Sequence, residues 1–201
     1  MGQMKFIADL HFGHKNILAY DNRRFPDIET HDREIVRLWN EHTSPEDEVW
    51  ILGDISWLNP SKTAEIFNSL NGRLRLIVGN HDHGLIKKAA VRECFEELAD
   101  YKELRLSAEQ TLVLCHYPIP CFNNHYLGWT HLYGHVHASF EWSMTENARY
   151  QMEQLYMKPC DMINVGCMLP YMEYYPLTLD EIKFRYSNYY QAQQKEGNQH
   201  D

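Results

Sequence analysis

Five short clusters of aspartate, asparagine and histidine occur along about two-thirds of the chain, and each follows a run of apolar residues. In α/β sheets the carboxyl ends of parallel strands lie at one edge, which is where ligands bind. Clusters at five strand ends are therefore expected to converge on a single site. The clusters are Asp9-Leu10-His11, Gly53-Asp54, Gly79-Asn80-His81-Asp82, Cys115-His116 and Gly134-His135-Val136-His137.

The spacing within the clusters and the types of donor atom both indicate metal binding. Asp9 and His11 are two residues apart, so on extended backbone both side chains point to one side of the strand. The same holds for His135 and His137. Oxygen ligands mixed with imidazoles suit Mn, Fe, Zn or Ni better than Ca or Mg, which prefer oxygen alone. The sequence thus predicts a mixed-donor site for divalent metal ions.

The elements that must position these clusters alternate between apolar strands and amphipathic helices, which predicts an α/β layered fold with a largely parallel sheet. Asn59 and Pro60 are typical of a helix start. Strands are predicted over the segments 6–8, 49–52, 76–78, 101–106, 112–114, 131–137, 162–166 and 177–186. Helices are predicted over 31–42, 60–71 and 85–94, and residues 138–160 indicate an excursion or an irregular helix.

Taken in order, the motifs D-x-H, G-D, G-N-H-D, H and G-H-x-H resemble those of the calcineurin-like metallophosphoesterase superfamily. The longer forms Asp-Leu-His-Phe-Gly-His, Leu-Cys-His-Tyr-Pro and Leu-Tyr-Gly-His-Val-His resemble the small single-domain members found in bacteria and their viruses. One such motif is weak evidence, whereas five in order are strong. The resemblance implies a four-layer α/β/β/α sandwich and a dinuclear metal centre.

The resemblance also assigns roles to individual residues of this chain. It places Asp9, His11, Asp54 and His137 on the first metal ion. It places Asp54, Asn80, His116 and His135 on the second ion, with Asp54 bridging the two. His81 matches the histidine that contacts the phosphate and protonates the leaving group. Asp82 is expected to orient either His81 or a metal ligand.

The function that follows is a phosphoesterase with two divalent metal ions, Mn being favoured and Fe, Zn or Ni left open, and a metal-bound hydroxide as the nucleophile. Two divalent ions outweigh two aspartates and one hydroxide by about one charge, which suits an anionic substrate. Phosphodiesters are slightly favoured, because no run of basic residues is available for a more highly charged phosphate. A phosphomonoesterase acting on small molecules or phosphoproteins is the alternative. A non-catalytic scaffold is also considered, but it would be expected to lack His81 or several ligands.

Composition limits the partners. The 201 residues have a formal net charge of −9, which disfavours extended contacts with nucleic acid or anionic membranes, although a nuclease stays open. No apolar run is long enough to span a membrane, and the first residues do not resemble a secretory signal, so a cytoplasmic protein is expected. We predict one domain over 1–188 and a flexible tail over 189–201. Both a monomer and a homodimer fit.

Several residues near the motifs allow two readings. His14 either lines the substrate pocket or is a surface histidine, and His31 is expected to face solvent. Arg23 and Arg24 are either a phosphate clamp or, in the favoured reading, a solvated pair in a loop. The segment 121–129 is expected to rim the pocket, where its aromatic residues either stack on a base or pack over the sheet.

Overall fold

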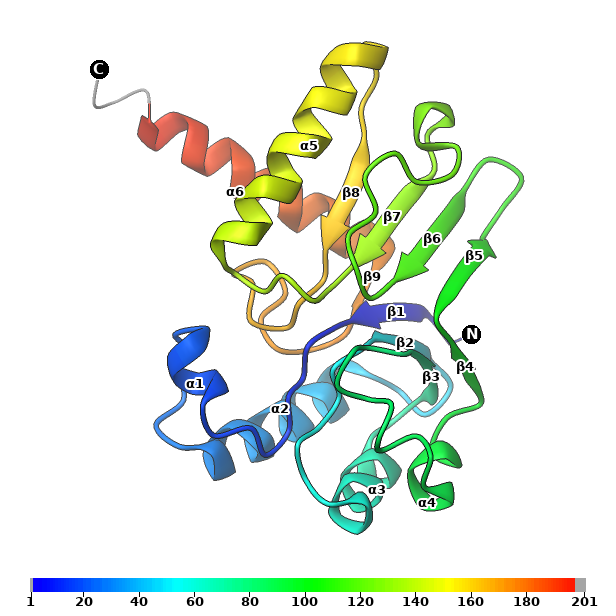
Figure 1. The fold of residues 1–201 in the computed structure, drawn as a ribbon, viewed down its shortest axis with the longest axis vertical. Coiled ribbons are helices and arrows are strands. Elements are labelled where there is room, and N and C mark those ends of the chain that lie inside the picture. Colours follow the sequence, from blue (N-terminus) through cyan, green and yellow to red (C-terminus); the bar gives the residue numbers. More distant parts are fainter. Residues whose placement is uncertain (1, 198–201) are drawn as a thin grey trace.

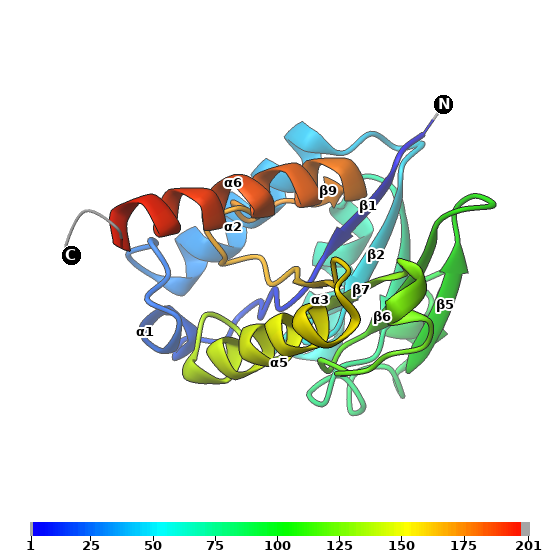
Figure 2. The same ribbon diagram turned by 90° about the horizontal axis from the view of Figure 1, so that it is seen from above.

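The computed structural model describes residues 2–197 and consists of two β-sheets with helices on their outer faces. The first sheet has the strand order β4-β3-β2-β1-β9, and the second has the order β5-β6-β7-β8. In Figure 1 the first sheet and helices α1–α4 occupy the lower half of the molecule, and the second sheet with α5 and α6 occupies the upper half. Figure 2 shows α5 and α6 extending to the same side of the molecule, away from β5 and β6.

Most strand pairs are parallel, as the sequence predicts. The parallel pairs are β1–β2, β2–β3, β3–β4, β6–β7 and β7–β8, whereas β9 and β5 join their sheets in antiparallel orientation. The strands are β1 (Met4–Ile7), β2 (Glu48–Leu52), β3 (Arg73–Ile77), β4 (Glu97–Ala99), β5 (Tyr101–Arg105), β6 (Thr111–Cys115), β7 (Thr130–Tyr133), β8 (Asp161–Asn164) and β9 (Leu177–Thr178). The α-helices are α1 (Ile17–Tyr20), α2 (Ile28–His42), α3 (Pro60–Ser69), α4 (Ala89–Arg92), α5 (Phe140–Tyr156) and α6 (Leu179–Gly197), and a short 3₁₀ helix covers His125–Leu127.

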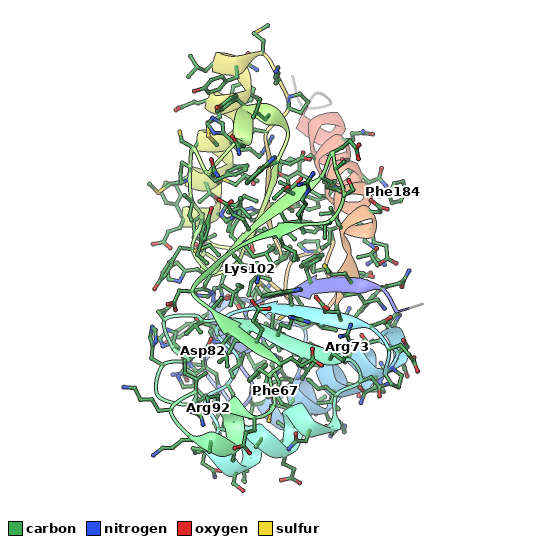
Figure 3. All side chains as sticks on the ribbon, turned by 90° about the vertical axis from the view of Figure 1, so that its right-hand side faces the viewer. Phe67, Arg73, Asp82, Arg92, Lys102 and Phe184 are labelled. Carbon is green, nitrogen blue, oxygen red and sulfur yellow. The ribbon has the colours of Figure 1, made fainter. Side chains whose placement is uncertain are left out.

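Three apolar clusters hold the layers together. The largest lies between the sheets and includes Phe6 and Trp50 from the first sheet and Leu114 from the second. Another fills the space between the first sheet and helices α2 and α3, where Trp39 and Phe67 pack (Figure 3). The third lies between the second sheet and α5. The order is helix, sheet, sheet, helix, which confirms the predicted four-layer sandwich.

Local sequence signals account for the helix starts on the outer layer. The Asn59 side chain accepts a hydrogen bond from the Lys62 N–H at the start of α3, and Pro60 occupies the first helical position, as predicted. Asp27 caps α2 in the same way, through the Thr30 N–H. These caps fix the residue at which each helix begins, and so the length of the loop between each helix and the preceding motif.

The predicted elements of the C-terminal third were partly wrong. The segment 138–160 contains a regular 17-residue helix, α5, and only two residues of the predicted strand 177–186 are extended. Helix α6 begins at Leu179 and continues to Gly197, past the start of the predicted tail at residue 189. The rings of Tyr186 and Tyr189 pack against Tyr171, and Tyr189 also packs against Trp142, so the helix is held to the rest of the fold beyond residue 186. Residues 198–201 of the predicted tail lie outside the described residues.

The two sheets are joined just beyond the ends of β1 and β8. Ala8, just after β1, forms a parallel bridge with Gly166, just after β8. The Ala8 N–H donates to Val165 O at 2.9 Å, and the Cys167 N–H donates to Ala8 O at 2.9 Å. This bridge places the carboxyl ends of β1 and β8 side by side. Within residues 2–197 no helix combines the length and the apolar character needed to cross a membrane.

Candidate functional site

Four side chains with metal-ligating atoms meet where β1, β2 and β7 end. Asp9 and His11 follow β1, and Asp54 follows β2. His137 follows β7, and one ligand atom from each of the four lies within 4.8 Å of the others. The Nε2 atoms of His11 and His137 are 3.1 Å apart, and His11 Nε2 lies 3.8 Å from Asp54 Oδ2. These residues, here called the first donor group, are the ones that the resemblance assigns to the first ion.

A second donor group, made of Asp54, Asn80, His116 and His135, lies beside the first. Asn80 Oδ1 is 3.0 Å from His116 Nε2 and 3.0 Å from His135 Nδ1. His116 Nε2 also lies 3.6 Å from Asp54 Oδ1. The residues assigned to the second ion are therefore also brought together by the fold.

Asp54 belongs to both donor groups through different oxygen atoms. Its Oδ2 faces His11, whereas its Oδ1 faces His116. The carboxylate is only 2% exposed and is held by its loop, because the His81 N–H donates to Oδ1 at 3.1 Å. Its position between the groups is the one that a shared ligand requires.

The backbone is left-handed at five of the seven donor residues, which differs from the predicted extended conformation. The φ angles are 56° at Asp9, 54° at His11, 55° at Asp54, 70° at His135 and 50° at His137. Residues other than glycine rarely adopt such angles, and they occur mostly at functional sites, where surrounding contacts hold the strained backbone. The paired side chains thus reach one site because the chain turns sharply after each strand.

Two glycines allow the loops to approach this closely. A Cβ atom at Gly53, which has a φ of 84°, would lie 2.4 Å from His116 Nδ1. A Cβ atom at Gly79 would lie 2.4 Å from Asp54 Oδ1. Any side chain at either position would displace a donor residue.

The outer nitrogens of the histidines are held so that their other nitrogens face the donor groups. His137 Nδ1 is 2.8 Å from Asp21 Oδ1, and His116 Nδ1 is 2.8 Å from Leu52 O. His11 Nδ1 is 3.3 Å from His14 Nδ1. Partners of this kind fix the ring orientation and tautomer of metal-binding histidines. In all three residues it is Nε2 that faces a donor group.

Burial and charge at the site fit divalent cations. Burial raises the pKa of the Asp9 and Asp54 carboxyl groups above their ordinary value. Burial also lowers the pKa of the His11 and His116 imidazoles, which favours their neutral form. Among the described residues no lysine or arginine side chain contacts either carboxylate. Buried carboxylates without a lysine or arginine partner require positive charge, and divalent metal ions supply it.

Comparison with known proteins agrees with this site. The model of the calcineurin-like phosphoesterase family matches residues 4–158. The chain belongs to this family. The family consists of metal-dependent phosphoester hydrolases. The buried Asp/His cluster of this phosphoesterase fits the metal site of such an enzyme.

Individual relatives are similar over different lengths. An uncharacterised protein of Methanocaldococcus jannaschii is 31% identical over 141 residues, which cover 69% of this chain and 72% of the relative. The gene 66 protein of Mycobacterium phage L5 is 39% identical over 87 residues, or 41% of each chain. The crystal structure of a protein of unknown function from Aquifex aeolicus has a TM-score of 0.68 at 26% identity, covering 91% of this chain and 98% of that one.

Two residues predicted to act outside the donor groups lie on the loop after β3. The His81 side chain is 49% exposed, with Nε2 4.0 Å from Asp54 Oδ2. Asp82 is fully buried, and its carboxylate accepts hydrogen bonds from the N–H groups of Gly79, Asp54 and Ile55 at 2.8–2.9 Å. Of the two expected roles for Asp82, this geometry supports the positioning of the Asp54 loop.

Arg23 is neither a phosphate clamp nor a solvated residue, so both readings were wrong. It is 5% exposed and lies beneath the site, where Nη2 donates to Asp9 O and Nη1 to Leu10 O. His31 is fully buried beside it, with Nε2 2.9 Å from Arg23 Nη1. The expectation that His31 faces solvent was therefore wrong. Arg24 extends away, over the Tyr174 ring. Arg23 therefore holds the loop that carries Asp9 and His11.

A cleft of about 500 Å³ opens above the donor groups. His14 lines it, as one of its two readings expected, together with Trp57 and Tyr20. None of the described residues in 121–129 lines it, and Phe122 and His125 in that segment are buried under the second sheet instead. Asp21 and Trp57 were missed by the sequence analysis. Their closeness to the first and second motifs was the one available signal.

Proposed function

We propose that this phosphoesterase hydrolyses small phosphate esters at a dinuclear metal centre, with phosphodiesters favoured over phosphomonoesters. The observation that carries the proposal is the position of Asp54, whose two oxygens face two separate donor groups. A carboxylate placed in this way suits a bridging ligand between two ions. The completeness of both groups disfavours the alternative of a non-catalytic scaffold.

The residues that would hold the metal are the two donor groups, and manganese is the ion we favour for their mixture of oxygen and nitrogen atoms. When bound, a pair of divalent ions neutralises charge on the phosphoryl group and supplies a nucleophile at neutral pH. Around them, Asp21, His14 and the Leu52 carbonyl keep the imidazoles aligned. Asp82 and Arg23 hold the backbone of the loops that carry the aspartates.

His81 is the candidate proton donor to the leaving group. It belongs to neither donor group, yet its side chain lines the cleft and is half-exposed. A group half-exposed beside the reacting phosphate can donate a proton to the departing oxygen and recover it from water. No covalent bond between substrate and protein is required.

The preference for diesters follows from the charges of the cleft. Its described lining contains no lysine or arginine, and it does contain the carboxylate of Glu141. A diester carries a single negative charge, whereas a monoester carries nearly two at neutral pH. A site with no basic side chain beside its metal ligands suits the smaller charge. The net charge of −9 likewise supports a small molecule over a nucleic acid.

The test measures metal content and ester hydrolysis on the same samples. Metal-stripped protein is reloaded with Mn, Ni, Zn or Mg, and the bound ions are counted by elemental analysis. Each sample is then assayed with bis-p-nitrophenyl phosphate and p-nitrophenyl phosphate. We expect about two ions per chain in the active protein and faster hydrolysis of the diester. Full activity with one ion per chain contradicts the dinuclear centre, and faster hydrolysis of the monoester contradicts the stated preference.

A further inference from the structure

One wall of the cleft is formed by aromatic side chains, and no step of the proposed reaction uses two of them, Trp57 and Tyr20. The Trp57 indole lies 4.2 Å from the His14 ring, with an angle of 7° between the ring planes, and 4.6 Å from the His11 ring. Tyr20 meets His14 edge-on, with the ring centroids 6.1 Å apart. We call Tyr20, His14 and Trp57 the aromatic wall.

The aromatic wall is next to the residue that we propose as the proton donor. The Trp57 ring centroid lies 4.4 Å from that of His81. A group attached to the phosphate near His81 therefore also lies near the indole. Trp57 is 38% exposed and Tyr20 is 73% exposed, so neither ring is fully used in packing the core.

The rest of the cleft offers no positive side chain to a second anionic group. Of its described lining residues, Asp21 and Glu141 are acidic and none is lysine or arginine. Arg23 is close in sequence to the lining residues Tyr20 and Asp21, but its guanidinium is buried. It is already bound to the Asp21 carboxylate and to the carbonyls of Asp9 and Leu10. A substrate with a further phosphate or carboxylate would meet Glu141 without a counter-charge.

We propose that the aromatic wall selects esters whose organic group is a flat, uncharged aromatic ring, with Trp57 as the residue that determines this specificity. The inference rests on the proposed function, because it places the phosphate at the donor groups. Stacking of a planar ring on an exposed indole accounts for the preference, since the faces of aromatic rings attract each other in offset or parallel arrangements. Trp57 contacts the organic group and takes no part in the bond cleavage.

The test measures binding of three phosphonates, whose C–P bond is not cleaved by ester hydrolysis. Phenylphosphonate carries a flat ring, cyclohexylphosphonate a saturated ring of similar size, and methylphosphonate no ring. Each is titrated into manganese-loaded protein by calorimetry. We expect phenylphosphonate to bind about tenfold more tightly than either of the others, as one stacked ring would give.

Variants locate the source of the preference. Trp57→Ala should weaken phenylphosphonate about tenfold and leave methylphosphonate within twofold, whereas Trp57→Phe should keep most of the preference. Phe184→Ala is the matched control, because Phe184 projects from α6 (Figure 3), is 70% exposed and is not among the residues that line the cleft. It should change none of the three constants.

The outcomes separate this inference from the proposed function. If no phosphonate binds to the manganese-loaded protein, the phosphoester site itself is contradicted. If all three bind with equal affinity, the site stands and the aromatic preference is wrong. If phenyl- and cyclohexylphosphonate bind equally well and both lose affinity in Trp57→Ala, the wall selects apolar groups of any shape and the stacking argument fails. The wild-type comparison decides the proposal even if Trp57→Ala does not fold.

Discussion

The two sheets contribute different chemistry to the same site. The loops after the first sheet supply every oxygen donor, namely Asp9, Asp54 and Asn80, together with one imidazole. The loops after the second sheet supply only imidazoles, from His116, His135 and His137. In the proposed metal centre the first sheet would therefore contribute the negative charge that attracts a cation, and the second sheet would contribute the imidazoles that complete its coordination.

This division predicts which losses matter most. A carboxylate from the first sheet contributes both charge and a ligand atom, and Asp54 does so for both donor groups. An imidazole from the second sheet contributes one nitrogen atom to one group. Changes on the side of the first sheet should therefore affect metal binding more strongly, and the predictions below test this difference.

The largest effect is expected at Asp54. Asp54→Ala should abolish binding of both ions and reduce hydrolysis to background, because each donor group loses its shared carboxylate. His137→Ala should mainly weaken one ion. Elemental analysis of the two variants after loading with manganese gives the comparison, with Asp180→Ala, an exposed aspartate on α6, as the control. Two ions retained in Asp54→Ala would reject its bridging position and the asymmetry between the sheets.

The next largest effect concerns His81, a histidine on the side of the first sheet that belongs to neither donor group. His81→Gln should retain its metal and lose roughly 10²–10⁴-fold in kcat with an alkyl ester, whose alkoxide leaves poorly without a proton. With a p-nitrophenyl ester the loss should be small, because nitrophenolate leaves readily unaided. The exposed neighbour His83 provides the matched control, His83→Gln. Equal losses with both esters would make His81 a charge stabiliser, and loss of metal would make it a ligand.

A smaller effect is expected at Asp21, which connects a histidine of the second sheet to the loops of the first. Its carboxylate lies 2.8 Å from His137 Nδ1 and 2.8 Å from Arg23 Nη2. Asp21→Asn should weaken one of the two ions about tenfold, the lower end of what loss of such a partner causes, and leave the other unchanged. Titration with manganese and a competing chelator measures the two affinities. Equal weakening of both ions would show that Asp21 acts on the whole fold.

The smallest effect is on stability, at His131 in the second sheet. Burial lowers its pKa to about 4 from the ordinary 6.5, while its ring bonds to Val113 O and to the Ile119 N–H. Below pH 6.5 the unfolded chain binds a proton that the folded chain excludes, so the stability that the neutral ring contributes is lost as the pH falls toward 4. Between pH 7 and pH 6 the loss should be about 0.7 kcal/mol. Urea unfolding of the manganese-saturated wild type and His131→Gln at both pH values isolates this contribution to the free energy of unfolding. An identical pH dependence in the two proteins would contradict the prediction.

The motif residues could be predicted from the sequence because they follow strands, and a strand end is a local property. The nine predicted residues all come together around one site, and four of them line the cleft, although their individual roles are still proposals. The reason given for the pairs was wrong, because left-handed backbone at Asp9 and His11 cannot be read from their spacing. Tertiary packing buries Arg23 and brings Asp21 to His137, and the closeness of Asp21 to the first motif does not reveal this contact.

The two C-terminal helices show a different kind of error. Helix α5 buries little more than Thr145 and Met152, so its apolar residues do not repeat with the period of a buried helix face. In α6 the signal was present and was not used. Leu179, Ile182, Tyr186 and Tyr189 recur at intervals of three and four residues, which is typical of a helix and incompatible with the strand predicted there.

The pairing of β1 with β9 has a consequence for how the chain acquires its structure during synthesis. Lys5 pairs with Thr178, so the first strand to leave the ribosome receives one of its two neighbours only near the end of translation. Until then one edge of the first sheet stays open, and open edges invite pairing between chains. We therefore expect a product truncated at residue 158, where the family match ends, to aggregate although it contains every residue of both donor groups.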